Sequence, residues 1–395
     1  MKFAHITDCH LGGWRQEELQ KLNMEYFREA INSSIEEEVD FVLFTGDLFD
    51  SAFPPIDVLK DTFFEFRKLK EKGVKCYVIA GSHDYSVSGK TFLDVLEMAG
   101  FCEIAKYEEN EEEVVLNPLN YESVHIYGYP GKKSGLEVDS IRKIKIKEPY
   151  ENNFRILMLH TTLTEVAEGL PIESVALSEL PKADYYAMGH IHVDYEHEND
   201  GKPVIYGGPT FPNNFKELED LGGGCFYIVE VNGFTKVTKK EIKLKEIISI
   251  NVEIDNSIVA NQRIISEIDK RDVNGKIVLL RVYGIITEGK TSDIDFRFIE
   301  NHVRSSGAYS FLKNTSKLEM AKQGIEIVTQ EKDMDKMEGL IIDRYGKENP
   351  SDFNNIIVQL IEVLNSGKQE DEKSAIFEDR LFDELENVLK VELKG

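Results

Sequence analysis

Cysteine is scarce in this chain: four cysteines, at positions 9, 76, 102 and 225, occur among 395 residues, and their spacing is irregular. This pattern argues against a disulfide framework and a structural zinc ribbon, because both need cysteines at paired spacings. Long apolar stretches are also missing, since no run approaches the roughly 20 residues that a membrane-spanning helix needs. The first residues lead directly into a strand-like segment and lack a signal-peptide pattern. We therefore expect a soluble intracellular protein, cytoplasmic or associated with the nucleoid, with no membrane contact.

Positive charge is also in short supply. The chain has 47 Lys and Arg against 72 Asp and Glu, a formal net charge of −25. This deficit argues against nucleic-acid binding, because duplex affinity normally comes from cationic side chains that neutralise phosphates. However, bound metal ions would make an acidic site locally positive. In addition, much of the acid lies in runs at 108–113, 370–372 and 378–379, which are typical of solvated loops. The net charge alone therefore does not exclude a nuclease.

Five short apolar runs in the first half of the chain end on residues that can bind a divalent metal ion. The runs cover residues 2–7, 41–45, 76–80, 156–159 and 185–188, and their richness in Val, Ile, Phe and Tyr predicts buried strands. The metal-binding candidates that follow them are Asp8, His10, Asp47, His160, His190 and His192. Strands that share a sheet can bring their ends together, so we expect one site. Mixed nitrogen and oxygen ligands favour Mn²⁺, with Fe²⁺ and Zn²⁺ as alternatives, over Mg²⁺ or Ca²⁺.

The spacing of these residues supports the same interpretation. Asp8 and His10, like His190 and His192, are two positions apart, so on an extended chain the members of each pair project to the same side. Each pair could then bind one ion or two neighbouring ions. Two such ions would clamp phosphoryl oxygens and activate a water molecule. The pattern therefore predicts cleavage of phosphate esters.

The ordered blocks resemble those of the calcineurin-like metallophosphoesterases, whose patterns are D-x-H, G-D, G-N-H-D or E, H, and G-H-x-H. This chain presents Asp8-Cys9-His10, Gly46-Asp47, Gly81-Ser82-His83-Asp84, His160 and Gly189-His190-Ile191-His192. The resemblance implies one ion bound by Asp8, His10, Asp47 and His192, and a second bound by Asp47, His160, His190 and Ser82. Asp47 would bridge the two ions, and the resemblance implies no other cofactor.

The resemblance also implies a general acid and exposes one departure from the family. His83 would donate a proton to the leaving oxygen, and Asp50 would orient its imidazole. Ser82 replaces the usual asparagine, and a hydroxyl is a weaker ligand than an amide oxygen. Either Ser82 reaches its ion through water and the second site is weak, or Ser82 only shapes the turn while the other ligands suffice.

Flanking motifs narrow the resemblance. The phosphatase signature G-D-x-x-D-R is absent, because Ser51 follows Asp50. The segments 205–210, 213–217 and 222–229 look like those of the SbcD and meiotic recombination eleven family of double-strand break repair nucleases. This resemblance implies a 3′–5′ double-strand exonuclease and single-strand endonuclease that acts on DNA ends, hairpins and single strands. It further implies an SbcC-type coiled-coil ATPase partner, related to SMC proteins, and a homodimer. The alternatives are a small-molecule or cyclic-nucleotide phosphodiesterase, or a weakly active DNA-binding scaffold for the ATPase.

The implied fold class is α/β, a four-layer αββα sandwich with a small α+β cap and a C-terminal helical tail. We expect a nuclease domain at 1–244 and a capping, DNA-binding domain at 245–335. The second domain shows no cluster of ligand-type residues, so a dimerisation or packing module is the alternative. In the cap, 247–254 and 276–283 read as strands, and 259–268 and 296–303 as helices.

Two further segments have open interpretations. The basic cluster consists of Lys132, Lys133 and the run 142–147, which alternates Ile and Lys. The run is either an edge strand with one apolar face or a contact to DNA phosphates. We expect residues 336–395 to form a linker and two amphipathic helices, at about 356–364 and 376–389. By resemblance these helices dock the ATPase; the alternative is that they pack back on the cap.

Overall fold

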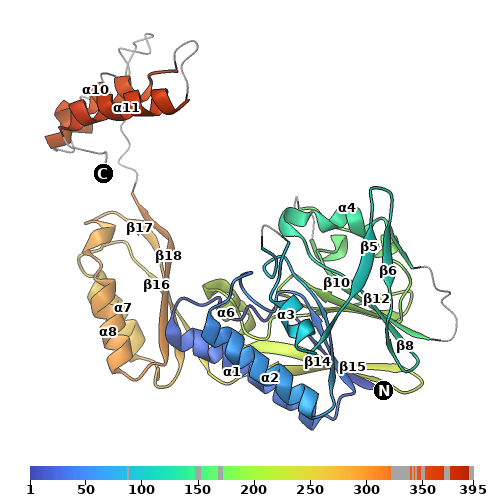
Figure 1. Ribbon diagram of the computed structural model, residues 1–395. Coiled ribbons are helices and arrows are strands. Elements are labelled where there is room, and N and C mark those ends of the chain that lie inside the picture. Colours follow the sequence, from blue (N-terminus) through green and yellow to red (C-terminus); the bar gives the residue numbers. More distant parts are fainter. Residues whose placement is uncertain are drawn as a thin grey trace. The chain divides into compact units, whose positions relative to one another are not determined.

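The computed structural model describes residues 1–86, 89–146, 153–167, 172–321, 339, 342, 345–347, 352–368 and 374–390. The chain divides into two compact units, Met1–Ala321 and Lys322–Gly395 (Figure 1). The expected boundary between residues 335 and 336 lies outside the described residues, so it stays a prediction. Within the described ranges, no helix is both long enough and apolar enough to cross a membrane.

Two six-stranded sheets form the centre of the first unit. In spatial order, the first contains β15 (Thr235–Ile242), β14 (Gly224–Val231), β1 (Lys2–Ile6), β2 (Phe41–Thr45), β3 (Lys75–Ile79) and β4 (Glu103–Ile104). The second contains β12 (Asp194–Asn199), β13 (Lys202–Gly207), β11 (Tyr185–Gly189), β10 (Phe154–His160), β8 (Val124–Tyr129) and β7 (Leu119–Tyr121). Neighbours β1, β2 and β3 pair in parallel, as do β8, β10, β11 and β13. The carboxyl ends of the parallel strands therefore meet at one edge of each sheet.

The two sheets pack face to face through a shared apolar layer. Phe41 and Tyr77 from the first sheet and Ile156 and Met158 from the second are fully buried in this layer. Helices α1 (Glu17–Glu36), α2 (Ile56–Glu71) and α3 (Leu93–Met98) cover the outer face of the first sheet (Figure 1). On the outer face of the second sheet lie α4 (Glu137–Ile141), α5 (Thr164–Ala167) and the small sheet β5-β6-β9. The predicted αββα order of layers is confirmed.

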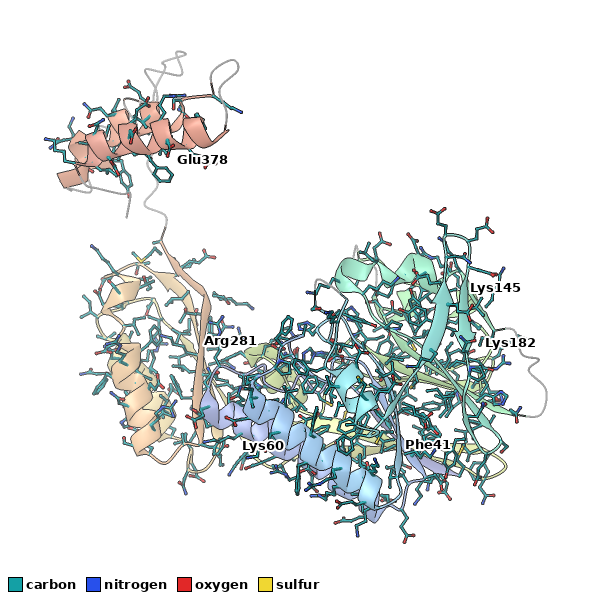
Figure 2. All side chains as sticks on the ribbon, in the orientation of Figure 1. Phe41, Lys60, Lys145, Lys182, Arg281 and Glu378 are labelled. Atoms are coloured by element: carbon teal, nitrogen blue, oxygen red, sulfur yellow. The ribbon has the colours of Figure 1, made fainter. Side chains whose placement is uncertain are left out.

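The small sheet shows where the basic run lies. Its strands are β5 (Lys106–Glu109), β6 (Val114–Asn117) and β9 (Ile144–Ile146), and β9 lies at the edge. Lys145, labelled in Figure 2, forms an ion pair with Glu113 at 2.9 Å, and Lys132 forms one with Glu109 at 2.9 Å. The edge-strand interpretation therefore fits, and the acidic run partly neutralises the basic one. Position 147 lies outside the described residues.

A second, smaller α+β layer follows in the same unit and is called the cap here. Its parallel sheet has the order β16 (Ile247–Glu253), β17 (Ile277–Ile286), β18 (Ser310–Met320), and helices α7 (Ala260–Asp269) and α8 (Phe296–Ser305) pack on it. The expected strands and helices correspond to β16, β17, α7 and α8, whereas β18 was not predicted. Tyr309 Oη donates to the carbonyl oxygen of Glu18 at 2.9 Å, which fixes the cap to α1.

The second unit contains the predicted C-terminal helices. After the 3₁₀ turn Asp352–Asn355 come α10 (Ile357–Leu364) and α11 (Ser374–Leu389), which contact each other. Some of their large apolar side chains face solvent: Leu364 is 62% exposed and Phe382 is 46% exposed. The helices therefore retain apolar surface within their own unit.

Candidate metal centre

The ends of β1, β2, β10 and β11 bring six of the predicted ligands together. Three groups of side chains have ligand atoms within 4.8 Å of one another. These groups are Asp8, His10 and His192; Asp47, His160 and His190; and His10, Asp50 and His83. The first two groups match the two sets of ligands expected from the sequence, with two differences. Ser82 is in neither group, and Asp47 is in the second group only.

Asp47 belongs to the second group and also lies beside His10 of the first group. Its Oδ2 atom is 3.6 Å from His10 Nε2 and 3.2 Å from His160 Nε2. Burial opposes a charge on Asp47, but the two imidazoles outweigh burial and hold the pKa of Asp47 well below its ordinary value. Asp47 is therefore ionised, and its carboxylate lies close enough to both groups to bind an ion in either one.

The expectation that these side chains leave an extended backbone is wrong. Strand β1 ends at Ile6, and Asp8, His10 and Asp47 have φ angles of +48°, +42° and +48°, in the left-handed region. His190 has a φ of +94°. Non-glycine residues rarely adopt such angles, and those that do cluster at functional sites. Here the loops are held by backbone bonds from His10 N to Asp47 O (3.0 Å) and from Asp8 N to Gly46 O (3.1 Å).

Two glycines allow the loops to approach the ligands closely. A Cβ atom at Gly46, which has a φ of +96°, would lie 2.1 Å from His160 Nδ1. A Cβ atom at Gly189 would lie 2.2 Å from the carbonyl oxygen of Thr45. Both distances are far below normal contact, so only glycine fits without a shift. These are the two glycines that the sequence placed beside ligands.

His160 provides a direct test of whether an ion fits. Its ring is fully buried, and Nδ1 lies 2.9 Å from the carbonyl oxygen of Thr45, which can only accept. Nδ1 is therefore the protonated nitrogen, and Nε2 has no hydrogen-bond partner. Burial lowers the pKa of His160, whereas neighbouring Asp47 outweighs it and raises the pKa to about 10. Nε2 faces Asp47 Oδ2 at 3.2 Å without forming a hydrogen bond. A divalent cation that takes the place of the second ring proton would bind both this nitrogen and the carboxylate, so the residues fit an ion.

Carboxylates also hold the two histidines of the first group. His10 Nδ1 lies 3.1 Å from Asp50 Oδ1, and His192 Nδ1 lies 3.0 Å from Glu217 Oε1. The Nε2 atoms of His10 and His192 face each other at 3.0 Å. Histidines that bind metal through Nε2 are usually held at Nδ1 in this way, so the arrangement fits an ion between them.

The position of Asp50 differs from the expected one. Its carboxylate oxygen Oδ1 lies 3.9 Å from His83 Nδ1, whereas its backbone carbonyl oxygen accepts from that nitrogen at 2.8 Å. Asp50 therefore holds His83 through the main chain and His10 through its side chain. The His83 ring is half-exposed, and its backbone N–H donates to Asp47 Oδ1 at 2.8 Å.

Two residues near the centre were not predicted to have a role. Asp84 is buried and accepts from the backbone N–H groups of Gly81 and Phe49, each at 2.9 Å, which ties the loops after β2 and β3 together. Burial and the nearby Asp47 carboxylate raise the pKa of Asp84 to about 6. Its place in the Gly81-Ser82-His83-Asp84 block was the available signal. Glu217, on helix α6 (Phe215–Leu221), lies in the flanking segment 213–217, but nothing in the sequence assigned that segment a role at the metal centre.

A cleft of about 600 Å³ opens beside these groups. Ser82, His83 and His190 line it near the candidate ligands, and Lys132 and Lys133 line it farther along the chain. Ser82 is half-buried at this surface. The cleft therefore gives a substrate access to the candidate general acid and to the second group.

Comparison with known proteins agrees with this geometry. Residues 1–194 match the family model described as calcineurin-like phosphoesterase, a region that contains all the candidate ligands. The chain is similar to the DNA double-strand break repair protein Mre11 of Methanocaldococcus jannaschii, with 32% identity over 268 residues that cover 64% of this chain and 70% of the relative. Similarity to the protein of the same name from Archaeoglobus fulgidus extends over 392 residues at 23% identity, covering 87% of this chain and 84% of the relative. The protein of the same name from Sulfurisphaera tokodaii is 29% identical over 308 residues, which cover 73% of this chain and 74% of the relative.

Proposed function

The chain belongs to the family of the DNA double-strand break repair protein Mre11, and on this basis we propose that it is a two-metal nuclease that processes DNA ends. Membership confirms the predicted resemblance and makes the chain a metal-dependent phosphodiester hydrolase. The observation that carries the proposal is the pair of ligand groups, one containing Asp47 and the other beside it.

The proposed ligand sets follow the two groups. Asp8, His10, Asp47 and His192 would hold one ion, and Asp47, His160, His190 and Ser82 the other. When bound, two divalent ions polarise the phosphoryl oxygens and lower the pKa of a water molecule that attacks the phosphorus. Manganese is the proposed metal, because mixed imidazole nitrogen and carboxylate oxygen donors suit it. Iron and zinc bind the same mixture of donors, so they are the alternatives.

His83 is the proposed general acid. Its Nδ1–H donates to the Asp50 carbonyl oxygen, which leaves Nε2 for the cleft. In the imidazolium form, Nε2–H can give its proton to the leaving oxygen of the scissile phosphate. A His83→Ala variant should bind Mn²⁺ like the wild type, as measured by calorimetry, and lose roughly 10²–10⁴-fold in cleavage rate. Normal metal binding together with full cleavage would contradict this role.

DNA is the proposed substrate, and its ends, hairpins and single strands are the proposed sites of attack. Lys133 at the cleft, together with the bound cations, would supply the positive charge that the chain as a whole lacks. Lys132 also lines the cleft, but its charge is paired with Glu109. End-labelled duplex, hairpin and single-stranded DNA, incubated with Mn²⁺ or Mg²⁺, should show 3′–5′ degradation of duplex ends and internal cleavage of single strands. Efficient hydrolysis of a small chromogenic diester without preference for DNA would favour a small-molecule phosphodiesterase. Bound metal without cleavage of any substrate would favour a DNA-binding scaffold.

The proposed partner is a coiled-coil ATPase of the SbcC type, which would dock on α10 and α11. The exposed apolar side chains of Leu364 and Phe382 support this assignment, because unpartnered apolar surface on a helix pair suits a helical partner. Leu364→Asp combined with Phe382→Asp should abolish co-purification with the ATPase and leave metal-dependent hydrolysis unchanged. Glu362→Gln, on the same helix as Leu364, is the matched control. Retained binding by the double variant would refute docking on this surface.

A homodimer is also proposed. Ile56 on α2 is 82% exposed and Met98 on α3 is 90% exposed, and Phe53 packs edge-on against Phe92 just before these helices, with ring centroids 6.5 Å apart. Large apolar side chains exposed on neighbouring segments would suit a protein interface if they form one patch. Ile56→Glu with Met98→Glu should convert a dimer into a monomer in analytical ultracentrifugation. Phe234→Glu, at a remote exposed phenylalanine, should leave the mass unchanged.

A further inference from the structure

A ring of polar contacts surrounds the first ligand group. His10 Nδ1 lies 3.1 Å from Asp50 Oδ1, and Asn213 Nδ2 donates to the same oxygen at 3.1 Å. The backbone N–H of Asn213 donates to Glu217 Oε2 at 2.8 Å, and Glu217 Oε1 lies 3.0 Å from His192 Nδ1. His192 Nε2, at 3.0 Å from His10 Nε2, closes the ring. Asn213 and Glu217 are not among the candidate ligands, so the ring joins residues outside the centre to both of its histidines.

This ring of contacts defines which nitrogen of each histidine is free to bind a metal ion. A carboxylate can only accept a hydrogen bond, so Asp50 and Glu217 place protons on His10 Nδ1 and His192 Nδ1. The Nε2 atoms of the neutral rings then carry lone pairs that point toward each other. Two lone pairs at this separation repel unless a cation lies between them, and the carboxylates prevent the rings from rotating away. Glu217 and Asp50 are thus equivalent supports, one for each histidine.

Helix α6 keeps Glu217 in place from several sides. Asn214 caps the helix by accepting from Glu217 N at 3.0 Å, and Gly222 ends it with a left-handed φ of +64°. Leu218 is fully buried in the core. Arg281, labelled in Figure 2, reaches α6 from the cap: it pairs with Glu219, and its guanidinium lies 5.1 Å from the centre of the Phe215 ring. A supporting residue on a fixed helix can hold a ligand with little motion.

We propose that Glu217, braced by Asn213, is a positioning residue for the first ion: it holds His192 so that Nε2 faces the ion, as Asp50 holds His10. This inference rests on the proposed two-metal function and adds a residue that lies outside the ligand blocks. It predicts that the first ion depends on Glu217 and that the second ion does not. The reason is that His160, in the second group, is held by a backbone carbonyl and needs no carboxylate.

Calorimetric titration of the full-length protein with Mn²⁺ tests the proposal. Glu217→Gln removes the charge at nearly constant size, Glu217→Asp keeps a shortened carboxylate, and Asp220→Asn is the control on the same helix. Loss of a residue that orients a metal-binding histidine typically weakens affinity by about 10–100-fold. We expect Glu217→Gln to bind one Mn²⁺ normally and the other about 10–100-fold more weakly. Glu217→Asp should recover part of this loss, and Asp220→Asn should match the wild type.

Other outcomes overturn the proposal. Wild-type affinity for both ions in Glu217→Gln would show that His192 needs no carboxylate. Equal weakening of both ions, with a lower melting temperature of the metal-free variant and no recovery in Glu217→Asp, would show a general structural role instead. Because these titrations contain no DNA, they are independent of nuclease activity. A wild type that binds two Mn²⁺ but cuts no DNA would refute the proposed function and leave this inference standing.

Discussion

Replacement of Gly189 by alanine should damage the second ligand group without removing any ligand. The new Cβ atom would lie 2.2 Å from the Thr45 carbonyl oxygen, 2.3 Å from Thr7 Oγ1 and 2.9 Å from His160 Nδ1. To reach even a tight contact of 3.0–3.4 Å, the carbonyl must move by about 1 Å. That carbonyl is the group that holds His160 Nδ1 at 2.9 Å. A shift of this carbonyl should therefore move the whole His160 ring, including Nε2, which faces Asp47.

The magnitude follows from packing and geometry. Overpacking of this kind costs about 1–3 kcal/mol, and a displacement of about 1 Å among positioned groups can cost roughly 10²-fold in rate. For a domain of 150–250 residues, each kcal/mol lowers the melting temperature by about 2–4 °C. Gly189→Ala should therefore remain folded at 25 °C, melt several degrees lower, and hydrolyse a chromogenic phosphodiester about 100-fold more slowly at saturating Mn²⁺.

A matched control separates loss of stability from loss of the site. Gly73 has a φ of +76°, and no atom lies within 4 Å of a Cβ built there. Gly73→Ala should cost about 1–2 kcal/mol, because alanine disfavours the left-handed region, and should keep full activity. The assays are differential scanning fluorimetry, Mn²⁺ titration and initial rates. A Gly189→Ala enzyme with the wild-type turnover number and Mn²⁺ affinity would refute the reasoning.

Three further predictions concern side chains. Asp50→Asn should weaken one Mn²⁺ by about 10–100-fold in calorimetry, because His10 loses its carboxylate; unchanged affinity would contradict this. If Ser82 makes the second site weak, Ser82→Asn should lower the Mn²⁺ concentration for half-maximal activity about tenfold, which corresponds to about 1.4 kcal/mol of binding free energy. Identical metal dependence in the two proteins would favour a turn-shaping role for Ser82. Burial raises the pKa of Glu18, but hydrogen bonds, including one from Arg304, outweigh burial and lower it below its ordinary 4.5. This contribution to stability is present above the ordinary pKa and is lost as the pH falls through the lowered value. Arg304→Ala should therefore lower stability by roughly 0.2–1 kcal/mol at pH 7 and by less at pH 3 in urea titrations, and a constant difference would argue against the pair.

Much of the fold could be predicted because its signals are local. The apolar runs at β1, β2, β3, β10 and β11 are short and contiguous, and each ends on a polar block, so strand identity and order follow from neighbouring residues. The cap was predicted less completely. Strand β18 carries the sequence Ser-Phe-Leu-Lys-Asn-Thr-Ser-Lys-Leu-Glu-Met, whose polar positions resemble a loop. Pairing with β17 along its length, a tertiary effect, makes this segment a strand.

The acidic run at 108–113 shows the same limit. Its charge was expected to be solvated, yet Glu109 and Glu113 are paired with lysines that lie 23 and 32 positions away. Sequence neighbours do not reveal such pairs, because the pairs depend on which strands become adjacent in the small sheet. The net charge of the chain therefore does not show which charges are paired.

The sequence by itself determined the family, the five strands that lead to the site and the identity of the six clustered candidate ligands, because each of these is encoded in a short block of adjacent residues. Tertiary structure decided how those residues are held. Asp8 and His10 meet their neighbours through a left-handed turn, and not from an extended strand. Glu217, on helix α6, reaches His192 from 25 positions away. Backbone strain and long-range contacts arise only when the packed core fixes distant segments side by side, and no local pattern in the chain records them.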